Sequence, residues 1–562
     1  MSAYDDLLSL TNSFEIYLGD PATQETPVNI QDSLNHDEQD ALPWAQVKFI
    51  QEWGFMEYLI PYRLEGKLKS LDELILVTRS ISRRDLTTPI ALGISFLAAL
   101  PVWIAGSAKQ QQYLAECLRR GETGAFGLTE EEHGSDAAAN EFSATPCNEG
   151  WTLSGKKWCI NFATFSQFTT LVCRTHSGGG PLGFSLFFLE KSQIKGLTPI
   201  PKLLTHGVRG LDISGFCLDN VFLPADALVG KEKRGLEIAY KTLQVTRALC
   251  AGFALGGADT ALRLALSFSL QRHLYNKKAY DIPAVKQRLG EQFTYLLIAD
   301  CITLTISRAA SIMPEKLSFW SAIIKFLVPS ISEHVVEQSG IILGARGYLR
   351  TTEWAMYQKM RRDVSVVSLF DGSSQVNLSV IASNLLPQAE MRGSFSLSNL
   401  SKIEQIFNIS RDCPEFSEKG LRLFTHSEDD LIGGLAYLES EMLKPMIHEI
   451  QSEVERLDID VISLKEQARL ETRSLTVFRL AERYCWLFAA SCCLQFWHYN
   501  QHQLPEALEG LDWITLAMDL ILDKLRVSSN TKSDLQESLA ERLCAYYSKH
   551  QMFSMVPTII SG

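Results

Sequence analysis

The hydrophobic pattern of this chain changes its period several times, and these changes limit the folds that the chain can adopt. Apolar residues recur at helical spacing through the first part of the chain, for example over 70–83. Over 124–222 the pattern becomes short apolar runs separated by turns, which predicts a small antiparallel barrel or sandwich. Helical periodicity returns over 235–386 and again over 430–550. We therefore expect a mainly α-helical protein with one small β domain between helical parts.

Individual elements can be placed within these blocks from spacing and turn residues. The expected helical segments are 37–58, 70–83 and 239–273. The expected strands are 168–174, 184–189 and 216–222, together with 150–161, which is interpreted as a turn, a strand, a turn and a strand. Polar composition predicts a loop over 21–35 and a linker or lid over 388–427.

Composition limits the class of partner. The chain has 562 residues, which suggests two to four domains. Hydrophobic residues make up 46% and charged residues 21%, an ordinary globular mixture. The net charge of −12 disfavours nucleic acid and an anionic membrane surface as partners. We also find no uninterrupted apolar run of spanning length, and the richest run, 484–497, is short and amphipathic.

Cysteine usage and the chain ends predict a cytoplasmic protein. The twelve cysteines are scattered and form no zinc-binding spacing with histidine, so no metal site is expected. Cys492 and Cys493 lie in an apolar run and are expected in the core. The acidic start MSAYDDLLSL has neither a signal-peptide n-region nor the arginines of a transit peptide, and VPTIISG is not a peroxisomal address. A reducing cytosol fits these features best.

Several short motifs carry candidate site residues. They are Gly127 to Asp136 (GLTEEEHGSD), Ser154 to Asn161 (SGKKWCIN), Thr246-Arg247, Gln271 to Asn276 (QRHLYN), Gly344 to Tyr348 (GARGY), Met360 to Asp363 (MRRD) and Phe370 to Val376 (FDGSSQV). Each motif alone is an ordinary turn or helix end, but their order and spacing along the chain are specific. Two residues of SGKKWCIN are not expected to contribute to a site. Trp158 should lie on the opposite face of its strand, and Cys159 can be read as a core residue.

Taken together, these motifs resemble the acyl-CoA dehydrogenase family over about residues 40 to 390. The resemblance implies an N-terminal helical domain (1–125), a middle β barrel (126–232) and a C-terminal four-helix bundle (233–388). An additional helical domain (389–562) resembles the extension of very-long-chain members. The acidic residues along this extension disfavour anionic lipid as its partner.

The resemblance also implies FAD as cofactor and assigns a role to each candidate residue. The catalytic base is Asp371, where most of the family have glutamate. The expected FAD contacts are Thr129, Ser135, Asn161, Arg272, Gly344, Gly347, Ser373 and Gln375, with Arg272 reaching the pyrophosphate bound by the partner subunit. The expected substrate contacts are Ser135, Thr246 and Arg247. Some family members carry an alternative catalytic glutamate at the position of Thr246, and this chain does not.

Oxidation of a saturated acyl thioester explains why such a site needs a base and a flavin. The base removes the α-proton while the β-hydrogen leaves as hydride, and no side chain accepts a hydride. Aspartate is one methylene shorter than glutamate, and a misplacement of about 1 Å can cost roughly 100-fold in rate. Burial beside an apolar substrate is expected to raise the pKa of Asp371.

Function and partners follow from the resemblance, with alternatives. We expect α,β-desaturation of an acyl-CoA or an acyl-carrier-protein thioester, in specialised metabolism, by a homodimer or homotetramer with an electron-transferring flavoprotein as partner. A flavin oxidase is one alternative, because nitroalkane oxidases resemble this chain in using aspartate as base. They carry an arginine seven residues later, where this chain has Leu378. The acyl-CoA oxidases, which have a larger extension, are related candidates. A non-catalytic flavin-binding scaffold is the second alternative.

Overall fold

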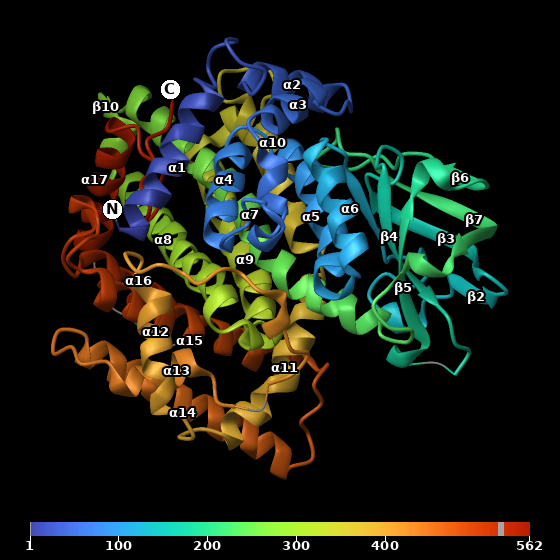
Figure 1. Cartoon of the computed structure of the whole chain (residues 1–562). Coiled ribbons are helices and arrows are strands. Elements are labelled where there is room, and N and C mark those ends of the chain that lie inside the picture. The colour runs from blue at the N-terminus through green and yellow to red at the C-terminus, as the bar shows by residue number, and fades with distance from the viewer. Residues whose placement is uncertain (1, 179, 426, 526–532, 562) are drawn as a thin grey trace.

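The computed structural model describes residues 2–178, 180–425, 427–525 and 533–561. Figure 1 shows the N-terminal helices in blue, the β domain in teal at one side and the long central helices in green and yellow. The N-terminal part consists of α1 (Ala3–Leu18), α2 (Ile30–Glu38), α3 (Trp44–Glu52), α4 (Leu71–Ser82), α5 (Thr87–Ala105) and α6 (Ala108–Arg119). The predicted helix over 37–58 is wrong, because α2 ends before Pro43 and a separate helix starts after it.

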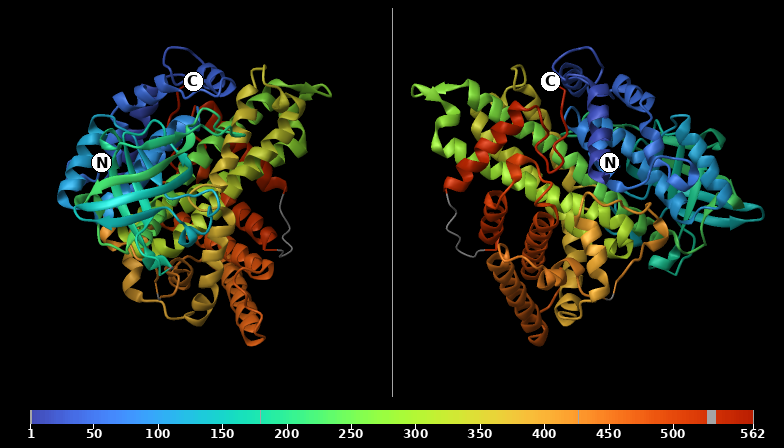
Figure 2. Two further views of the ribbon diagram at one scale, coloured as in Figure 1. Left: turned by 90° about the vertical axis from the view of Figure 1, so that its right-hand side faces the viewer. Right: turned by 60° about the vertical axis from the view of Figure 1, so that its left-hand side comes forward.

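The β domain is one curved sheet that encloses its own apolar core. Its strands are β1 (Gly124–Gly127), β2 (Ser143–Cys147), β3 (Gly150–Asn161), β4 (Phe168–Arg174), β5 (Phe184–Glu190), β6 (Leu197–Ile200), β7 (Ile213–Pro224) and β8 (Leu228–Val229). The strand order is β6-β7-β3-β2-β4-β5-β8, with β1 parallel to β4. The curvature of the sheet is visible in Figure 2.

The predicted turn inside 150–161 is wrong, because this segment is the single strand β3. Its register shifts between Leu153 and Gly155 and again between Trp158 and Ile160. Gly155 has φ 144°, a conformation that glycine adopts readily, so it accommodates an irregularity of the strand rather than reversing the chain.

Three long helices form the centre of the molecule. They are α7 (Gly235–Gln271), α8 (Pro283–Ile312) and α9 (Leu317–Leu343), and the shorter α10 (Ala355–Val364) and α11 (Ser374–Glu390) pack against them. A two-stranded hairpin, β9 (His273–Leu274) and β10 (Lys277–Lys278), joins α7 to α8. Most of α7 is buried because α4, α5, α8 and α9 all contact it.

The C-terminal extension packs against this centre. Its helices are α12 (Leu400–Phe407), α13 (Asp430–Gly434), α14 (Lys444–Glu466), α15 (Leu475–Asn500), α16 (Asp512–Lys524) and α17 (Ser533–Ser548). Helix α12 falls within the predicted linker, so that segment is partly helical. Cys492 and Cys493 are buried in α15, which confirms that they are core residues.

After α17 the chain returns to α1, where the Ile559 N–H donates to Asn12 Oδ1 at 2.8 Å and Ser561 Oγ donates to the carbonyl of Glu15 at 2.9 Å. This tail is held by buried charged groups. Arg79 Nη1 lies 2.6 Å from Asp300 Oδ1, and Asp300 Oδ2 accepts hydrogen bonds from Ser554 Oγ at 2.7 Å and from the Met555 N–H at 2.6 Å. The extension is thereby connected to α4 and α8 of the central body.

Four helical segments are long and apolar enough to cross a membrane by length and composition alone. They are 87–105, 235–271, 283–312 and 314–348. The run 484–497, which had the strongest apolar signal by sequence, is not among them in the described residues. Between 78% and 89% of each most apolar window is buried inside the protein, so these windows serve as core.

Candidate active site

A large cavity lies where the β domain, the central helices and the extension meet. Its volume is about 1530 Å³. The walls come from α5, from the loops at 128–137 and 205–211, from strand β3, from α7, from the 366–376 segment and α11, and from two segments of the extension. The candidate residues that line it are Thr129, Ser135, Asn161, Thr246, Arg247, Asp371, Ser373 and Gln375. Motifs from four distant parts of the sequence are therefore brought to one cavity.

Asp371 lies in a tight turn that enters α11. Its φ is 53° and that of Gly372 is 94°, so two successive residues adopt left-handed backbone conformations. Aspartate tolerates this region better than most residues, and glycine has no side chain to restrict it. A Cβ at Gly372 would lie 3.0 Å from Arg247 Nη2. Ser373 then caps α11, since its Oγ accepts a hydrogen bond from the Val376 N–H at 3.4 Å. The Asp-Gly-Ser order thus suits the turn as well as the chemistry.

Helix α7 supports the base segment from one side. Arg247 Nε donates to the backbone carbonyl of Asp371 at 3.0 Å, so this guanidinium holds the turn in place. Cys250 Sγ lies 3.8 Å from Asp371 Oδ2. Burial raises the pKa of the Cys250 thiol, and the charge of Asp371 raises it further, so the sulfur keeps its proton and can donate to the carboxylate.

Helix α9 contributes a buried lysine, Lys325, that contacts the segment around Asp371. Lys325 Nζ donates to the carbonyls of Val367 at 2.5 Å and Gly372 at 3.4 Å, and it lies 5.4 Å from the ring centroid of Phe370. One ammonium group therefore connects both ends of the base segment. Burial lowers the pKa of Lys325, while Cys250 and Asp371 oppose that change.

The pKa of Asp371 is raised above that of an ordinary aspartate. Burial is the main cause, and the Thr246 hydroxyl and the charges of Lys325 and Arg247 act in the opposite direction. The Thr246 hydroxyl influences the carboxylate but does not reach hydrogen-bond geometry. A base whose pKa lies nearer the working pH transfers protons more effectively.

The motif analysis missed Cys250, which contacts Asp371, and Lys325, whose charge acts on the Asp371 carboxylate. Cys250 follows Thr246 by four residues, so helical spacing puts both on one face of α7. Lys325 is a charged residue within the long apolar stretch of α9, and an isolated charge in such a stretch is a recognisable signal.

The β-domain side of the cavity carries Thr129, Cys159 and Asn161. The Trp158 N–H donates to the carbonyl of Thr129 at 3.1 Å, which ties the 128–137 loop to β3. Cys159 is exposed and lines the cavity, because the backbone at this β-irregularity has φ 57°, so its interpretation as a core residue is wrong. Asn161 Oδ1 is buried and lacks a hydrogen-bond partner among the described residues, and so does Thr246 Oγ1. Such atoms are rare, and a polar ligand in the cavity would satisfy them.

Glu130 and Glu131 of the loop turn away from the cavity, whereas Asp136 lines it. Glu130 accepts hydrogen bonds from buried Lys157 at 2.7 Å and from the N–H groups of Glu141 and Phe142. Glu131 pairs with Lys156 at 2.5 Å on the surface. Neither of these two carboxylates is among the described residues that line the cavity, so both are engaged in holding the loop.

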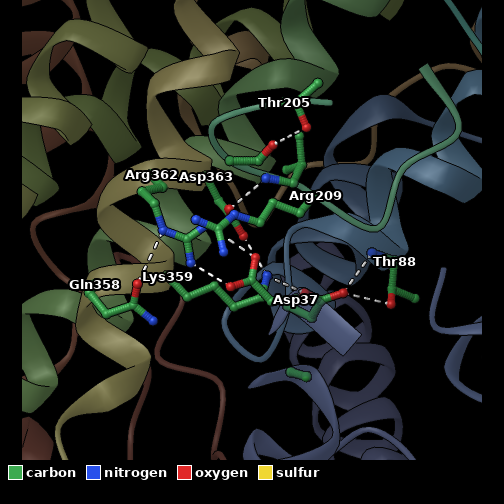
Figure 3. A network of polar contacts seen from close by, with 12 residues as sticks. Asp37, Thr88, Thr205, Arg209, Gln358, Lys359, Arg362 and Asp363 are labelled. Atoms are coloured by element: carbon green, nitrogen blue, oxygen red, sulfur yellow. Dashed lines mark hydrogen bonds and ion pairs between the residues drawn. The ribbon is translucent and has the colours of Figure 1, made fainter. Parts of the chain in front are cut away.

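The MRRD motif is part of a buried network that joins three parts of the chain (Figure 3). Lys359 Nζ lies 2.5 Å from Asp363 and 2.6 Å from Asp85, and Asp363 Oδ1 accepts a hydrogen bond from the Val208 N–H at 2.6 Å. Burial would lower the pKa of Lys359, but the two carboxylates raise it well above its usual value. Val208 lines the cavity, so this network fixes the 205–211 wall.

Arg362 extends the network to the N-terminal helices. Its guanidinium pairs with Asp37 at 2.5 Å and donates to the carbonyl of His206 at 3.1 Å. Figure 3 shows Arg362 and Asp37 pointing toward each other between their two elements. The motif therefore supports the site without lining it.

Arg272, Gly344 and Gly347 lie outside the cavity. Arg272 is exposed at the C-terminal end of α7, about 39 Å along the helix from Thr246 at 1.5 Å per residue. Gly344 and Gly347 follow the end of α9, and Gly347 has no room for a side chain because a Cβ would lie 2.9 Å from the Tyr357 ring. One protomer therefore does not bring all the predicted FAD contacts together.

Comparison with known proteins agrees with this architecture. Residues 125–221 match the acyl-CoA dehydrogenase middle domain, and residues 233–386 match the acyl-CoA dehydrogenase C-terminal domain. The 3-(aryl)acrylate reductase of Clostridium sporogenes is 28% identical over 357 residues, covering 62% of this chain and 92% of that protein. The mitochondrial short-chain specific acyl-CoA dehydrogenase of Bos taurus is 28% identical over 356 residues, covering 62% and 84%.

Solved structures extend the fold similarity. An acyl-CoA dehydrogenase of Bacillus anthracis complexed with FAD aligns with a TM-score of 0.73 at 16% identity, covering 99% of this chain and 93% of that chain. The prolyl acyl carrier protein oxidase AnaB aligns with a TM-score of 0.61 at 18% identity, covering 68% and 98%. The first of these shares the fold of the extension as well as that of the body.

The fold and the two matched domains define an oxidoreductase that acts on CH–CH groups. The chain belongs to the acyl-CoA dehydrogenase family. FAD is the cofactor of this family, and the unpaired buried oxygens of Asn161 and Thr246 fit a polar cofactor in the cavity.

Proposed function

We propose that this protein desaturates an acyl thioester between Cα and Cβ, with Asp371 as the base that removes the α-proton. The observation that carries the proposal is the environment of Asp371. Of the carboxylates among the described lining residues, Asp136 is exposed and Glu237 is paired with Arg234 and Lys241. Asp371 has no ion-pair partner among the described residues, and burial raises its carboxylate pKa.

An apolar pocket adjoins the base. Ile90, Ile94 and Leu97 of α5 and Leu249 and Phe253 of α7 line this side of the cavity. Such a wall suits the hydrocarbon part of an acyl group and keeps water from the carboxylate. Desolvation explains why the pKa of the base is raised.

Several groups of the chain would act during proton removal. The turn held by Arg247 and Lys325 fixes the carboxylate relative to the substrate. The backbone N–H of Asp371 would donate to the thioester carbonyl, where negative charge develops as the α-proton leaves. Ser135, Thr246 and Arg247 are the proposed substrate contacts. Cys250, which keeps its own proton, would help to orient the carboxylate.

Thr129 and Asn161 would hold the isoalloxazine edge of FAD, and Ser135, Ser373 and Gln375 would contact other parts of the cofactor. When bound, FAD supplies the acceptor for the hydride that leaves Cβ. The distance from Arg272 to the cavity supports a dimer in which Arg272, Gly344 and Gly347 reach the cofactor of the partner subunit.

Exposed apolar residues near Arg272 are consistent with such an assembly. Leu274 and Tyr275 in the hairpin are 36% and 88% exposed, and Tyr348 beyond the end of α9 is 85% exposed. Because α8 and α9 are neighbours joined by a short connection, the end of α9 returns to the hairpin end of the bundle. Figure 2 shows both at one end of the molecule. We propose a homodimer or homotetramer on this basis.

The proposal also covers the group that carries the acyl chain and the acceptor of the electrons. Both CoA and a carrier protein present the same pantetheine arm, and the fold is shared with a prolyl acyl carrier protein oxidase. A carrier-bound substrate in specialised metabolism, an electron-transferring flavoprotein as acceptor and a cytoplasmic location remain part of the proposal. Oxygen as acceptor is the second candidate, favoured by the aspartate base. Leu378 is buried and apolar, which argues against a nitroalkane oxidase.

The decisive experiment starts with the visible spectrum of the purified protein. A flavin spectrum should be present, and anaerobic addition of acyl-CoA or acyl-carrier-protein thioesters of graded length should bleach it with formation of an enoyl product. Bound flavin that no thioester bleaches would contradict the proposal and favour a scaffold. Rapid thioester-dependent consumption of oxygen would identify an oxidase.

A further inference from the structure

The C-terminal extension forms part of the cavity wall. Leu423 and Phe424, between α12 and α13, line the cavity, and so do Thr472 and Arg473, between α14 and α15, and Phe478 of α15. None of these residues lies in the matched family domains, which end at residue 386. The extension therefore adds surface to the site that the shorter relatives do not share.

Direct contacts hold the first of these segments against the central helices. Gln244 Nε2 donates to the carbonyl of Arg422 at 2.8 Å, and Ser318 Oγ lies 3.4 Å from Thr425 Oγ1. Gln244 and Ser318 also line the cavity. The wall from the extension is thus continuous with the walls from α7 and α9.

Helix α11 provides a polar stripe that leads away from the base. Ser379, Ser383 and Asn384 line the cavity at helical spacing after Ser373. The eleven-residue separation of Ser373 and Asn384 corresponds to about 16 Å at 1.5 Å per residue. The cavity therefore follows α11 outward from Asp371.

The hydrogen bonds of this stripe indicate what it can bind. Ser379 Oγ donates to the carbonyl of Gln375, Ser383 Oγ to that of Ser379, and Asn384 Nδ2 to that of Val380. Each side chain uses a donor within its own helix and keeps oxygen lone pairs for the cavity. The stripe is therefore suited to a ligand with N–H groups.

Arg473 adds a positively charged group to the same cavity. It is exposed, lines the cavity and has no hydrogen-bond or ion-pair partner among the residues that the structure describes. A free guanidinium offers forked donors that match phosphate oxygens. One cavity thus holds an apolar wall, Asp371, the acceptor groups of α11 and a cation.

We infer that Thr472 and Arg473 complete a subsite for the 4′-phosphopantetheine arm of the substrate, with Arg473 binding its phosphate. The arm carries two amide groups between the thioester sulfur and one phosphate, so it meets the acceptors of α11 first and the guanidinium last. The inference rests on the proposed thioester chemistry and assigns the extension a direct role in substrate binding. Coenzyme A and a carrier protein both present this arm.

Isothermal titration of the flavin-containing protein with 4′-phosphopantetheine, pantetheine and CoA tests the inference. Arg473→Ala should weaken binding of 4′-phosphopantetheine and CoA about 10-fold, the low end for a hydrogen bond to a charged group, and leave pantetheine unchanged. Arg473→Lys should restore part of the loss, since it keeps the charge. Arg479→Ala is the matched control, because Arg479 is exposed on α15 and does not line the cavity.

The outcomes separate this inference from the proposed function. Three results would overturn the phosphate assignment. In Arg473→Ala, the affinities for pantetheine and 4′-phosphopantetheine could weaken equally, or neither affinity could change. The unaltered protein could also fail to bind 4′-phosphopantetheine. Thioester-dependent flavin bleaching, measured separately, tests the proposed function alone. If CoA binds much more tightly than 4′-phosphopantetheine, the natural substrate carries the nucleotide of CoA. If the two bind with equal affinity, the natural substrate is attached to a carrier protein. Both results support the phosphate subsite.

Discussion

Replacement of Asp371 with asparagine removes the proposed base with little change of shape. Asparagine tolerates the left-handed conformation at φ 53° about as well as aspartate, so the turn and its bond from Arg247 should persist. General base catalysis contributes about 10²- to 10⁴-fold. The rate of flavin reduction should fall by that factor, which corresponds to roughly 3 to 5 kcal/mol in activation free energy.

The same substitution should change stability in a predictable direction. Because burial raises the pKa of Asp371 in the folded state, its contribution to stability is complete below the ordinary aspartate pKa and is lost as pH rises through the raised value. Asparagine does not ionise. The variant should therefore gain stability relative to the unaltered protein as pH rises toward neutrality.

Anaerobic stopped-flow measurement of flavin bleaching across pH, with denaturant unfolding at each pH, tests both effects. The unaltered protein should lose activity as pH falls, with an inflection above that of an ordinary aspartate. Asp226→Asn is the control, because Asp226 is 69% exposed and pairs with the exposed Lys109. Flavin reduction by Asp371→Asn within about threefold of the unaltered rate would place the base elsewhere and refute the reasoning.

Three further substitutions test parts of the scaffold. Lys325→Met should move the acid limb of the pH–rate profile to higher pH, because the lysine charge lowers the pKa of Asp371. The flavin content should stay the same. An acid limb at unchanged pH would argue against this coupling. Arg79→Met leaves the buried carboxylate of Asp300 without its ion-pair partner. The free energy of unfolding, measured by urea titration, should fall by about 3–5 kcal/mol. A change below about 1 kcal/mol would mean that the C-terminal tail does not depend on this pair. Gly290→Ala should cost about 1–3 kcal/mol and lower the melting temperature, because its Cβ would lie 1.8 Å from a backbone oxygen of α17, and an unchanged melting temperature would show that α17 moves freely.

Local pattern was sufficient to predict most of the fold. The strand 168–174 and the helix 70–83 follow from residue spacing alone, and the structure confirms them to within a residue. Predictions were wrong where a single residue changed the backbone. Pro43 divides a helix, and Gly155 accommodates an irregularity in a strand rather than a turn. Periodicity does not distinguish these cases because it reports which face is buried and not the path of the backbone.

The candidate site shows the same division. Motif order predicted Asp371 and the residues of the loop at 129–135, because each motif carries its chemistry within a few positions. The roles of Arg247 and Lys325 were not predictable from their own segments, since each acts on backbone carbonyls more than 40 residues away in the chain. Arg362 and Asp363 proved to be structural, because their partners come from the N-terminal helices and the β domain.

The sequence by itself determined the order of helical and β blocks, the family motifs and the choice of Asp371 as the candidate base, because these depend on residue type and short-range spacing. Only the tertiary structure decided which charges surround the base, which way the loop carboxylates turn and that the extension reaches the cavity. Desolvation and ion pairing act through space, so the raised pKa of Asp371 and the place of Arg473 in the wall of the same cavity depend on how segments remote in the chain pack together.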